Sequence, residues 1–473
     1  MEIAPLWVIE NQWYDLSYLE SRGISVDSLR QLTEGQTPIA LLRRQNGSTE
    51  VQFRFVGIIA NNSSVLYCVP KYTDKLPEIP DAELIDSFKA TLSATLRATH
   101  TRLKSIGSQD FYRNDSSQTD HWLTTARALI YDFIRAGSYY SRVTTIGNDP
   151  YDEACWDETI ASSLAMYKAG RPFYPEPFTH NQQLTCNSVI ARLHHSILQD
   201  ALDRLHGYDP LNALNIPRPV IPASIPITSL GSVTSLLHII ESESRRQFED
   251  RKLKSLRLMS NYLRELPSPS RPERYLTIGT TSFHVVWETI CSWYFRDELK
   301  EGKYRISSPI WNYHVSQPNG TYAEVSHFGN GTLIPDIAFR HQNRIYLIDA
   351  KYYVPRFEEE GIWNQPGATD IAKQYVYVAA IETLWPACHL HFNAFVFPLR
   401  HECNQDKQCS VRIRGSVFLP FGRLQSLPQI RIVEACPLTL INHYNQRTRH
   451  SKSALCALLG LSLIHISEPT RLL

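Results

Sequence analysis

Apolar residues in the first part of the chain gather in short β-rich runs that polar turns separate. Residues 51–60 and 65–72 form two such runs, and Asn61-Asn62-Ser63-Ser64 lies between them. Runs of this length with a polar turn between them predict a β-hairpin. Because two prolines interrupt the pattern shortly before residue 81, residues 1–80 are expected to form a small β-containing region.

Helical spacing replaces this pattern through the middle of the chain. From residue 81 to residue 106 the apolar positions fall on one face of a helix: Leu84, Phe88, Leu92 and Leu96. The same spacing predicts further helices at 121–137, 187–205 and 234–266. We therefore expect a mainly helical middle region at 81–270, joined to a final domain by Ser268-Pro269-Ser270-Arg271-Pro272.

The last large region combines helical and extended patterns, which is typical of an α/β fold. An apolar helix is predicted at 283–295, two strands at 334–340 and 345–349, and another helix at 370–380. A mixed sheet flanked by helices is therefore expected in the C-terminal half, within a domain at 271–440.

Composition and charge exclude some classes of protein. The formal net charge is +1, so nucleic-acid contacts must come from local basic patches rather than from the whole surface. The nine cysteines are scattered, and the first residues lack the pattern of a secretory leader, so reduced thiols and a cytoplasmic location are expected. No run reaches the ~18 apolar residues that span a bilayer, which argues against a membrane protein.

The last residues, 461–473, resemble a translated transposase adapter of the kind used in DNA library preparation. We therefore exclude them from the fold prediction as a non-native tail, and we expect the natural C-terminus to differ.

Three polar residues stand at the ends of the two strands predicted in the final domain. Asp336 enters the first strand, and the apolar run Ile345-Tyr346-Leu347-Ile348 leads to Asp349 and Lys351. Side chains alternate along a strand, so Asp349 and Lys351 project to the same face. Mg²⁺ takes oxygen ligands. Asp336, Asp349 and the backbone carbonyl of Ala350 are therefore candidate ligands, and Lys351 would orient the attacking water and offset negative charge.

Two helices flank these strands with further candidates. Glu288 is an acid within a strongly apolar helix. An unpaired buried carboxylate is costly, so Glu288 needs a partner such as a metal, a metal-bound water or Lys351. Gln374 lies on the following helix, where its amide could hold a phosphate or a water. Together these residues predict Mg²⁺-dependent hydrolysis of phosphodiester bonds.

An acid-x-Lys triplet alone is a weak signal, because the chain has four of them: Asp250/Lys252, Glu298/Lys300, Glu301/Lys303 and Asp349/Lys351. The last triplet differs because it follows an apolar strand and has a Pro-Asp pair shortly upstream. The alternative is a surface ion pair on a hairpin, which would contribute little to stability. A non-catalytic DNA- or partner-binding subunit on a nuclease scaffold, and a DNA repair or junction nuclease, are alternative functions.

The arrangement resembles the PD-(D/E)XK nuclease superfamily, and over about residues 50–440 the chain is similar to LlaJI-type restriction endonucleases. The similarity also rests on three segments: Phe55-Val56-Gly57-Ile58, Val69-Pro70-Lys71-Tyr72 and Trp156-Asp157-Glu158-Thr159-Ile160. Gln374 with its neighbouring tyrosines resembles an extension seen in McrC-like members. The resemblance implies a PD-(D/E)XK fold whose active site consists of Glu288, Asp336, Asp349 and Lys351.

The resemblance also implies a biological role and partners. The substrate would be foreign double-stranded DNA, as in phage defence. A separate McrB-like GTPase motor and a companion DNA methyltransferase would act beside this chain. The sequence contains no G-x-x-x-x-G-K-[ST] motif, so it has no recognisable nucleotide motor of its own.

Two other groups of residues have a possible functional interpretation. Zinc ligands are one interpretation of a cluster that lacks a paired C-x₂-C and could equally hold free thiols: Cys388, His389, His391, His401, Cys403 and Cys409. The segment 395–452 holds nine Lys or Arg residues against three acids. A phosphate-facing surface and a merely solvated face both fit that excess.

Overall fold

The computed structural model covers the 473-residue chain and describes most of it. The described residues are 5–22, 24, 32–33, 38–45, 47–61, 64–105, 117–149, 151–185, 188–266, 276–301, 304, 306, 308–317, 322–329, 333–400, 411–420, 422 and 427–461. The predicted non-native tail therefore lies, apart from Leu461, outside the described residues. No helix in the described part of the chain is both long enough and apolar enough to cross a bilayer.

Internal contacts divide the chain into two compact units. The middle unit consists mainly of Asp115–Leu276. The main unit combines Glu2–Ile59, Ser63–Asn114 and Thr277–Leu473. The N-terminal strands and the C-terminal α/β region thus belong to one unit, whereas the predicted domain boundaries at residues 80, 270 and 440 stay a prediction.

Two small sheets and a short helix form the first part of the main unit. Their elements are β1 (Leu6–Ile9), β2 (Trp13–Asp15), α1 (Leu16–Ser21), β3 (Ala40–Gln45), β4 (Ser48–Phe53), β5 (Val56–Ala60), β6 (Val65–Val69) and β12 (Leu276–Thr280). One sheet has the strand order β2-β4-β3 and the other β1-β6-β5-β12. β1 and β6 run parallel, so both strands end at the same edge of the sheet.

Strands β5 and β6 flank residues 61–64 and are neighbours in one sheet, as the predicted hairpin requires. The run 51–60, however, is wrong as a single strand. The chain leaves β4 at Arg54 and Phe55 and enters β5, and these two strands belong to different sheets. The backbone nitrogen of Arg54 donates to the carbonyl of Ile39 (2.7 Å) at this break. A continuous β-rich run therefore supplies two sheets, which apolar periodicity alone does not reveal.

Two glycines bring the backbones of β5 and β12 into close contact. Gly57 has a φ of +145° and Gly279 a φ of +157°. A Cβ on Gly57 would lie 2.1 Å from the carbonyl oxygen of Ile278, and one on Gly279 would lie 2.0 Å from that of Val56. Only glycine fits at both positions, and this contact connects the N-terminal sheet to the chain that leads into the C-terminal region.

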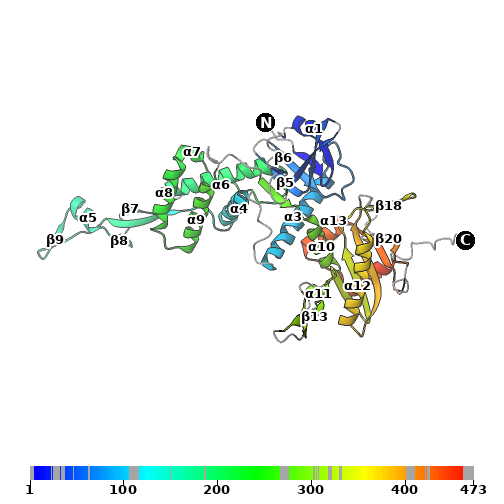
Figure 1. The fold of residues 1–473 in the computed structure, drawn as a ribbon. Coiled ribbons are helices and arrows are strands. Elements are labelled where there is room, and N and C mark those ends of the chain that lie inside the picture. The colour runs from blue at the N-terminus through cyan, green and yellow to red at the C-terminus, as the bar shows by residue number, and fades with distance from the viewer. Residues whose placement is uncertain are drawn as a thin grey trace. The chain divides into compact units, whose positions relative to one another are not determined.

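A five-stranded mixed sheet forms the C-terminal part of the main unit (Figure 1). Its strands are β15 (Ile337–His341), β16 (Arg344–Ala350), β19 (His389–Pro398), β20 (Val411–Val417) and β21 (Ile430–Ala435). Their order is β15-β16-β19-β21-β20. The three inner strands are parallel, and both edge strands are antiparallel to their neighbours. The expected mixed α/β architecture is confirmed at this level.

Helices cover both faces of this sheet. One face packs against α3 (Ala82–Ser105), α10 (Phe283–Tyr294), α13 (Pro437–Gln446) and α14 (Lys452–Leu461). The opposite face packs against α12 (Ala368–Leu384) through Tyr377, Val378 and Ile381. The predicted helices at 81–106, 283–295 and 370–380 are therefore confirmed as α3, α10 and α12. Burial of both faces explains why β16 is almost continuously apolar.

Short elements that the sequence did not predict complete the main unit. They are α11 (Glu298–Glu301) and two hairpins, β13 (Ile310–Ser316) with β14 (Tyr322–Phe328) and β17 (Arg356–Glu358) with β18 (Gly361–Trp363). Most side chains of both hairpins are exposed. β13 does alternate, with Trp311, Tyr313 and Val315 between polar residues, so its pattern was present and was overlooked. β17 and β18 have only three residues each, which is too short for a pattern to be recognised.

The middle unit is a group of helices with a small β-extension (Figure 1). Its helices are α4 (Ser117–Ala136), α5 (Trp156–Ser162), α6 (Val189–Tyr208), α7 (Ile227–Leu230), α8 (Val233–Ser244) and α9 (Asp250–Arg264). Its strands are β7 (Ser141–Gly147), β8 (Glu153–Ala154), β9 (Met166–Lys168), β10 (Arg171–Phe173) and β11 (Thr179–Thr185). The predicted helices at 121–137 and 187–205 are confirmed as α4 and α6.

The predicted helix at 234–266 is wrong in its continuity. It divides into α8 and α9, and residues 245–249 form the turn between them. The two helices pack against each other, which a straight helix could not do. The strands of this unit were missed because β7 and β11 are mostly polar and the others have only two or three residues.

Candidate active site

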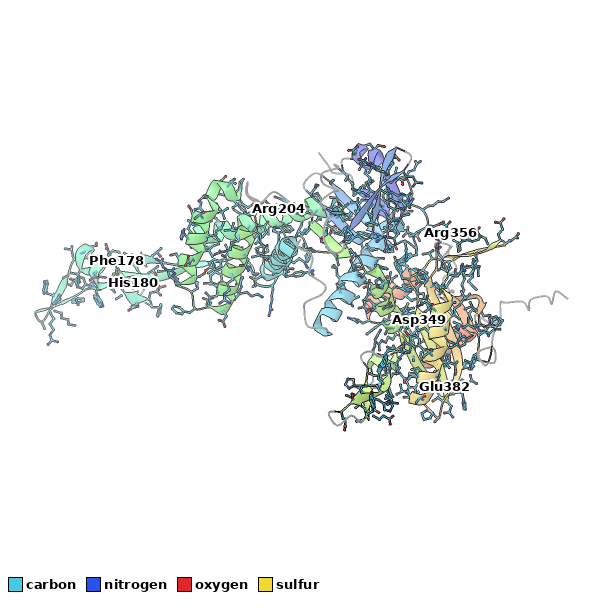
Figure 2. All side chains as sticks on the ribbon, viewed as in Figure 1. Phe178, His180, Arg204, Asp349, Arg356 and Glu382 are labelled. Carbon is cyan, nitrogen blue, oxygen red and sulfur yellow. The ribbon has the colours of Figure 1, made fainter. Side chains whose placement is uncertain are left out.

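Strand β16 delivers Asp349 to one face of the five-stranded sheet. Ile345, Leu347 and Asp349 alternate with Tyr346 and Ile348 and therefore point to the face that α12 covers. The carboxylate of Asp349 is enclosed there, with 4% of the residue exposed. Figure 2 shows Asp349 within the C-terminal sheet of the main unit.

Asp336 lies beside the end of β16 because it precedes the antiparallel neighbour β15. Its Oδ2 accepts a hydrogen bond from the backbone nitrogen of Ala350 (2.9 Å). Burial, followed by the nearby charges of Asp349 and Glu288, raises the pKa of Asp336 to about 7. The structure therefore brings Asp336 and Asp349 together at the strand end, with Glu288 of α10 near enough for its charge to act on Asp336.

Lys351 is held between two carboxylates. Its Nζ lies 2.8 Å from Oδ2 of Asp349 and 3.0 Å from Oδ1 of Asp370. Burial of the ammonium opposes its protonation, but Asp349 and Asp370 outweigh this effect and raise the pKa of Lys351. The backbone nitrogen of Lys351 also donates to the carbonyl of Val396 (2.9 Å), which fixes the segment against β19. Lys351 is therefore a protonated, positioned cation at neutral pH.

Gln374 is fully buried between α12 and the sheet. Its Nε2 donates to Oδ1 of Asn393 on β19 (2.7 Å). Oε1 of Gln374 and Nδ2 of Asn393 are buried without a recorded partner among the described residues. The predicted phosphate- or water-binding residue is thus bonded to the neighbouring strand, and this bond holds α12 to the sheet on which Asp349 lies.

Sequence reasoning missed two acids that shape this region. Asp370 stands in the first turn of α12, one turn before Gln374, and its contact with Lys351 is visible only in three dimensions. Asp297 is buried, and its Oδ1 accepts from the backbone nitrogen of Ala338 (3.0 Å) at the start of β15. Its signal in the sequence was an acid directly after the apolar helix that became α10.

The carboxylate oxygens of this site suit a hard cation, although the side chains are not already arranged around a metal position. Asp336 and Asp349 offer carboxylate oxygens, and crowded carboxylates favour a neutralising cation. Throughout the described ranges, no group of three or more His, Cys, Asp or Glu side chains is arranged to hold a metal ion. Asp349 is instead paired with Lys351, so a bound cation would share the carboxylates with that ammonium.

The zinc interpretation of the C-terminal cysteines and histidines lies partly beyond the described residues. His401, Cys403 and Cys409 fall within 401–410, which the structure does not describe. Of the remainder, His391 packs its ring against Tyr346 (centroids 5.4 Å apart), and Cys388 borders the apolar cluster under α12. These contacts match the alternative of a strand with free thiols.

Comparisons with known proteins place this chain in a family. A model of the LlaJI restriction endonuclease family matches residues 55–426 of the chain. The chain belongs to the LlaJI restriction endonuclease family. It is also similar to component YdjA of the type II restriction enzyme BsuMI from Bacillus subtilis (strain 168). The two are 26% identical over 393 residues, which cover 80% of this chain and 78% of that protein.

Two solved structures are similar to this LlaJI-family chain. One is a half-complex of Thermococcus gammatolerans McrB AAA+ hexamers with bound McrC, which matches with 13% identity and a TM-score of 0.35 over 94% of this chain and 99% of that chain. The other is the McrBC complex of the same organism, with 12% identity and a TM-score of 0.26 over 64% and 89%. The family match confirms the predicted resemblance to LlaJI endonucleases, and with it the coarse prediction of a restriction-system component.

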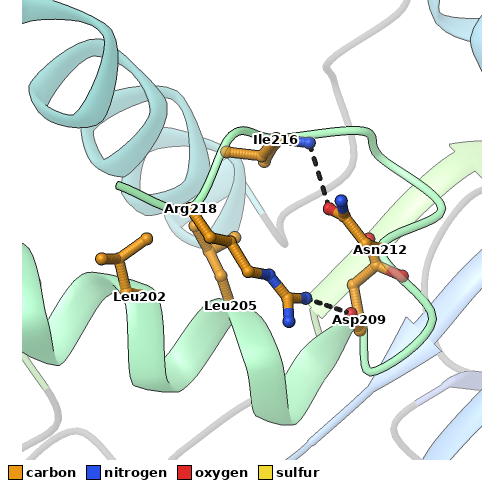
Figure 3. A pocket seen from close by; sticks show the side chains of 6 residues that line it. All are labelled: Leu202, Leu205, Asp209, Asn212, Ile216 and Arg218. Atoms are coloured by element: carbon orange, nitrogen blue, oxygen red, sulfur yellow. Dashed lines mark hydrogen bonds between the residues drawn. The ribbon is translucent and has the colours of Figure 1, made fainter. Parts of the chain in front are cut away.

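A small pocket in the middle unit of the LlaJI-family chain has a structural explanation (Figure 3). Its volume of about 10 Å³ leaves space for roughly one water molecule. Arg218 donates to the carbonyl of Asp209 (3.0 Å), and Asn212 accepts from the backbone nitrogen of Ile216 (3.1 Å). These bonds brace the loop that follows α6.

Proposed function

We propose that this chain is the Mg²⁺-dependent DNA endonuclease subunit of a restriction system, built on a PD-(D/E)XK fold. The observation that carries the proposal is the geometry at the end of β16. Asp349 and Lys351 are ion-paired there, and Asp336 is hydrogen-bonded to Ala350, the residue between them. An acid and a lysine on one face of a strand, with a second acid bonded to the intervening backbone, are the elements that metal-assisted phosphodiester hydrolysis needs.

The chain's own residues would bind the metal. Asp336, Asp349 and the backbone carbonyl of Ala350 would hold Mg²⁺, and Glu288 would support it from α10. When bound, Mg²⁺ stabilises negative charge on the phosphate and activates water. The raised pKa of Asp336, caused by burial and by Asp349 and Glu288, supports this assignment because a divalent cation would relieve that crowding.

Lys351 would act on the phosphate and the attacking water. Its raised pKa keeps it protonated at neutral pH, so it can donate hydrogen bonds but cannot accept a proton. It would orient the water whose oxygen attacks phosphorus and offset the charge that develops as the bond to the leaving oxygen breaks. Asp370 would hold the ammonium in place, and Gln374 would either contact the phosphate or position α12 through Asn393.

Partners form a further part of the proposal. We expect a McrB-like GTPase motor and a companion DNA methyltransferase, as the family resemblance implies. The absence of a G-x-x-x-x-G-K-[ST] motif from the sequence fits a motor that resides on another chain.

Plasmid cleavage tests this function. Purified wild-type protein is incubated with plasmid and Mg²⁺, with and without the McrB-like motor protein. The variants Asp349→Ala and Glu382→Ala are treated in the same way. Glu382 is exposed on α12 within the same unit and is labelled in Figure 2, so it serves as the matched control. Cutting that Asp349→Ala abolishes and Glu382→Ala retains is the expected result. DNA binding with no cutting under either condition would instead show that the chain is a non-catalytic scaffold. Cutting of junction DNA alone would show that it is a repair nuclease.

A further inference from the structure

A polar cleft lies within the main unit and is lined by Tyr352 and Tyr353, the two residues that follow Lys351 in the sequence. It consists of two neighbouring pockets of about 470 and 620 Å³, which share the lining residues Glu10, Asn11, Lys71 and Tyr353. Glu10 follows β1 and Lys71 follows β6, and these parallel strands end side by side. Tyr353 comes two residues after Lys351. The ends of β1 and β6 therefore lie at this cleft together with the segment that follows β16.

The charge in this cleft is predominantly positive. Its cations are Arg54, Lys71, Arg356 and Arg400, and its acids are Glu10 and Asp74. Both acids are engaged within the protein. Glu10 is buried and accepts a hydrogen bond from the hydroxyl of Tyr352 (2.5 Å), and Asp74 lies 3.6 Å from Arg400. No ion pair is recorded for Arg54 or Arg356 in the described part of the chain.

One of these cations is fixed in position by the residue next to Lys351. The Nζ of Lys71 lies 4.2 Å from the centre of the Tyr352 ring. That ring packs against Phe283 of α10 (centroids 5.1 Å apart). A cation over an aromatic ring gains electrostatic stabilisation without losing its charge. Lys71 is thus a positioned charge at the wall of the cleft, not a freely moving surface lysine.

We propose that this cleft binds the phosphodiester backbone of the DNA next to the scissile phosphate, with Lys71 and Arg356 as phosphate contacts. The proposal rests on the endonuclease function proposed above. Tyr353 lies at most ~7 Å along the chain from Lys351, a distance that corresponds to about two base-pair steps of rise along the B-DNA axis. Cations that line an open polar cleft suit successive phosphates, whereas side chains that select bases must reach into a groove. The N-terminal strands thereby gain a role in holding substrate.

DNA-binding measurements test the cleft without requiring catalysis. Anisotropy of a fluorescent duplex is measured in EDTA over a range of salt, using the full chain and its variants Lys71→Gln and Arg356→Gln. Arg44→Gln is the matched control, because Arg44 is an exposed cation on β3 that does not line the cleft. Each cleft variant should weaken binding roughly tenfold and lower the slope of log affinity against log salt by ~0.9, as expected for one lost phosphate contact. Arg44→Gln should change neither quantity.

The outcomes separate this proposal from the proposed function. Affinity and salt slope that stay at wild-type values in both cleft variants would overturn the cleft, even if Asp349→Ala abolishes cutting. If the wild-type protein never cuts DNA but Arg356→Gln still lowers the salt slope of DNA binding, the endonuclease function is refuted and the DNA-binding cleft is supported. Arg356 lies on an exposed hairpin, so its variant tests the cleft even if Lys71→Gln disturbs folding. The same measurement with a single-stranded probe shows whether one DNA strand is enough for binding to the cleft.

Discussion

The carboxylate of Asp336 and the backbone nitrogen of Ala350 are joined by a 2.9 Å hydrogen bond across the β15–β16 pair. This bond gives Asp336 two functions. One oxygen aligns the turn into β15 with the end of β16, and the negative charge adds to that of Asp349 beside it. A substitution can separate the two functions, because an amide keeps the acceptor and removes the charge.

Asp336→Asn should strongly reduce cutting but leave the fold intact. The amide oxygen can still accept from Ala350, so the unfolding midpoint should stay within a few degrees of wild type. Loss of the charge should lower the affinity for Mg²⁺ and with it cleavage by roughly 100-fold. Asp336→Ala should lose the hydrogen bond as well and destabilise the protein by about 1 kcal/mol more. Cleavage at wild-type rate by Asp336→Asn, measured on plasmid, would show that the charge is not needed.

Lys351→Gln should reduce cleavage by roughly 10²–10³-fold. The substitution removes the ammonium that lies 2.8 Å from Asp349 and 3.0 Å from Asp370, so charge developing on the phosphate is no longer offset. DNA affinity in EDTA should change far less, because the two acids already neutralise this lysine in the free protein. Lys89→Gln is the matched control, since Lys89 forms only a surface pair with Asp86 at 4.0 Å. Equal losses of binding and cleavage would assign Lys351 to DNA binding alone.

Gln374 and Asn393 form a buried amide pair that a double-mutant cycle can test. Gln374→Leu leaves the amide of Asn393 buried without its partner and should destabilise the protein by about 1–3 kcal/mol. The double variant Gln374→Leu/Asn393→Leu should recover much of this loss, because replacing both partners with apolar groups can be nearly neutral. Urea unfolding gives the stabilities. If the double variant is stable yet still fails to cut DNA, Gln374 acts on the substrate and not only on the position of α12.

The candidate site was predictable wherever local sequence determines it. Alternation along β16 placed Asp349 and Lys351 on one face, and the apolar run before them marked a strand buried on both sides. Asp370 was not predictable as a partner of Lys351, since that contact depends on how α12 packs onto the sheet. The break at Arg54 was missed for a related reason: two sheets share one continuous β-rich run, and only their packing decides where the run divides.

Gly57→Ala should destabilise the main unit by at least about 2 kcal/mol. The new Cβ would meet the carbonyl oxygen of Ile278 at 2.1 Å, and the φ of +145° is unfavourable for alanine. The contact between β5 and β12 would then open. Gly415→Ala is the matched control, because a Cβ there meets nothing within 4 Å. Thermal unfolding of both variants measures the difference, and equal midpoints would contradict the close approach of the two strands.

His194 should make the middle unit less stable in mild acid. Burial, and then the neighbouring His195 and Arg251, lower the pKa of His194 to about 4, while Asp132 acts in the opposite direction. The unfolded chain takes up this proton near pH 6.5 and the folded chain only near pH 4. Stability should therefore be complete above pH 6.5 and fall by up to about 3 kcal/mol as the pH drops towards 4. Urea unfolding at several pH values, followed by circular dichroism, measures this dependence.

The variant His194→Asn isolates this contribution. Nδ1 of His194 accepts a hydrogen bond from the backbone nitrogen of Tyr139 (3.1 Å), and the amide oxygen of asparagine can take over that role without a titrating group. Its stability should fall less steeply between pH 6.5 and pH 4 than that of wild type. His238→Asn, at an exposed position of α8, should keep the wild-type slope. Identical slopes for wild type and His194→Asn would mean that the protonation of other groups governs acid unfolding of this unit.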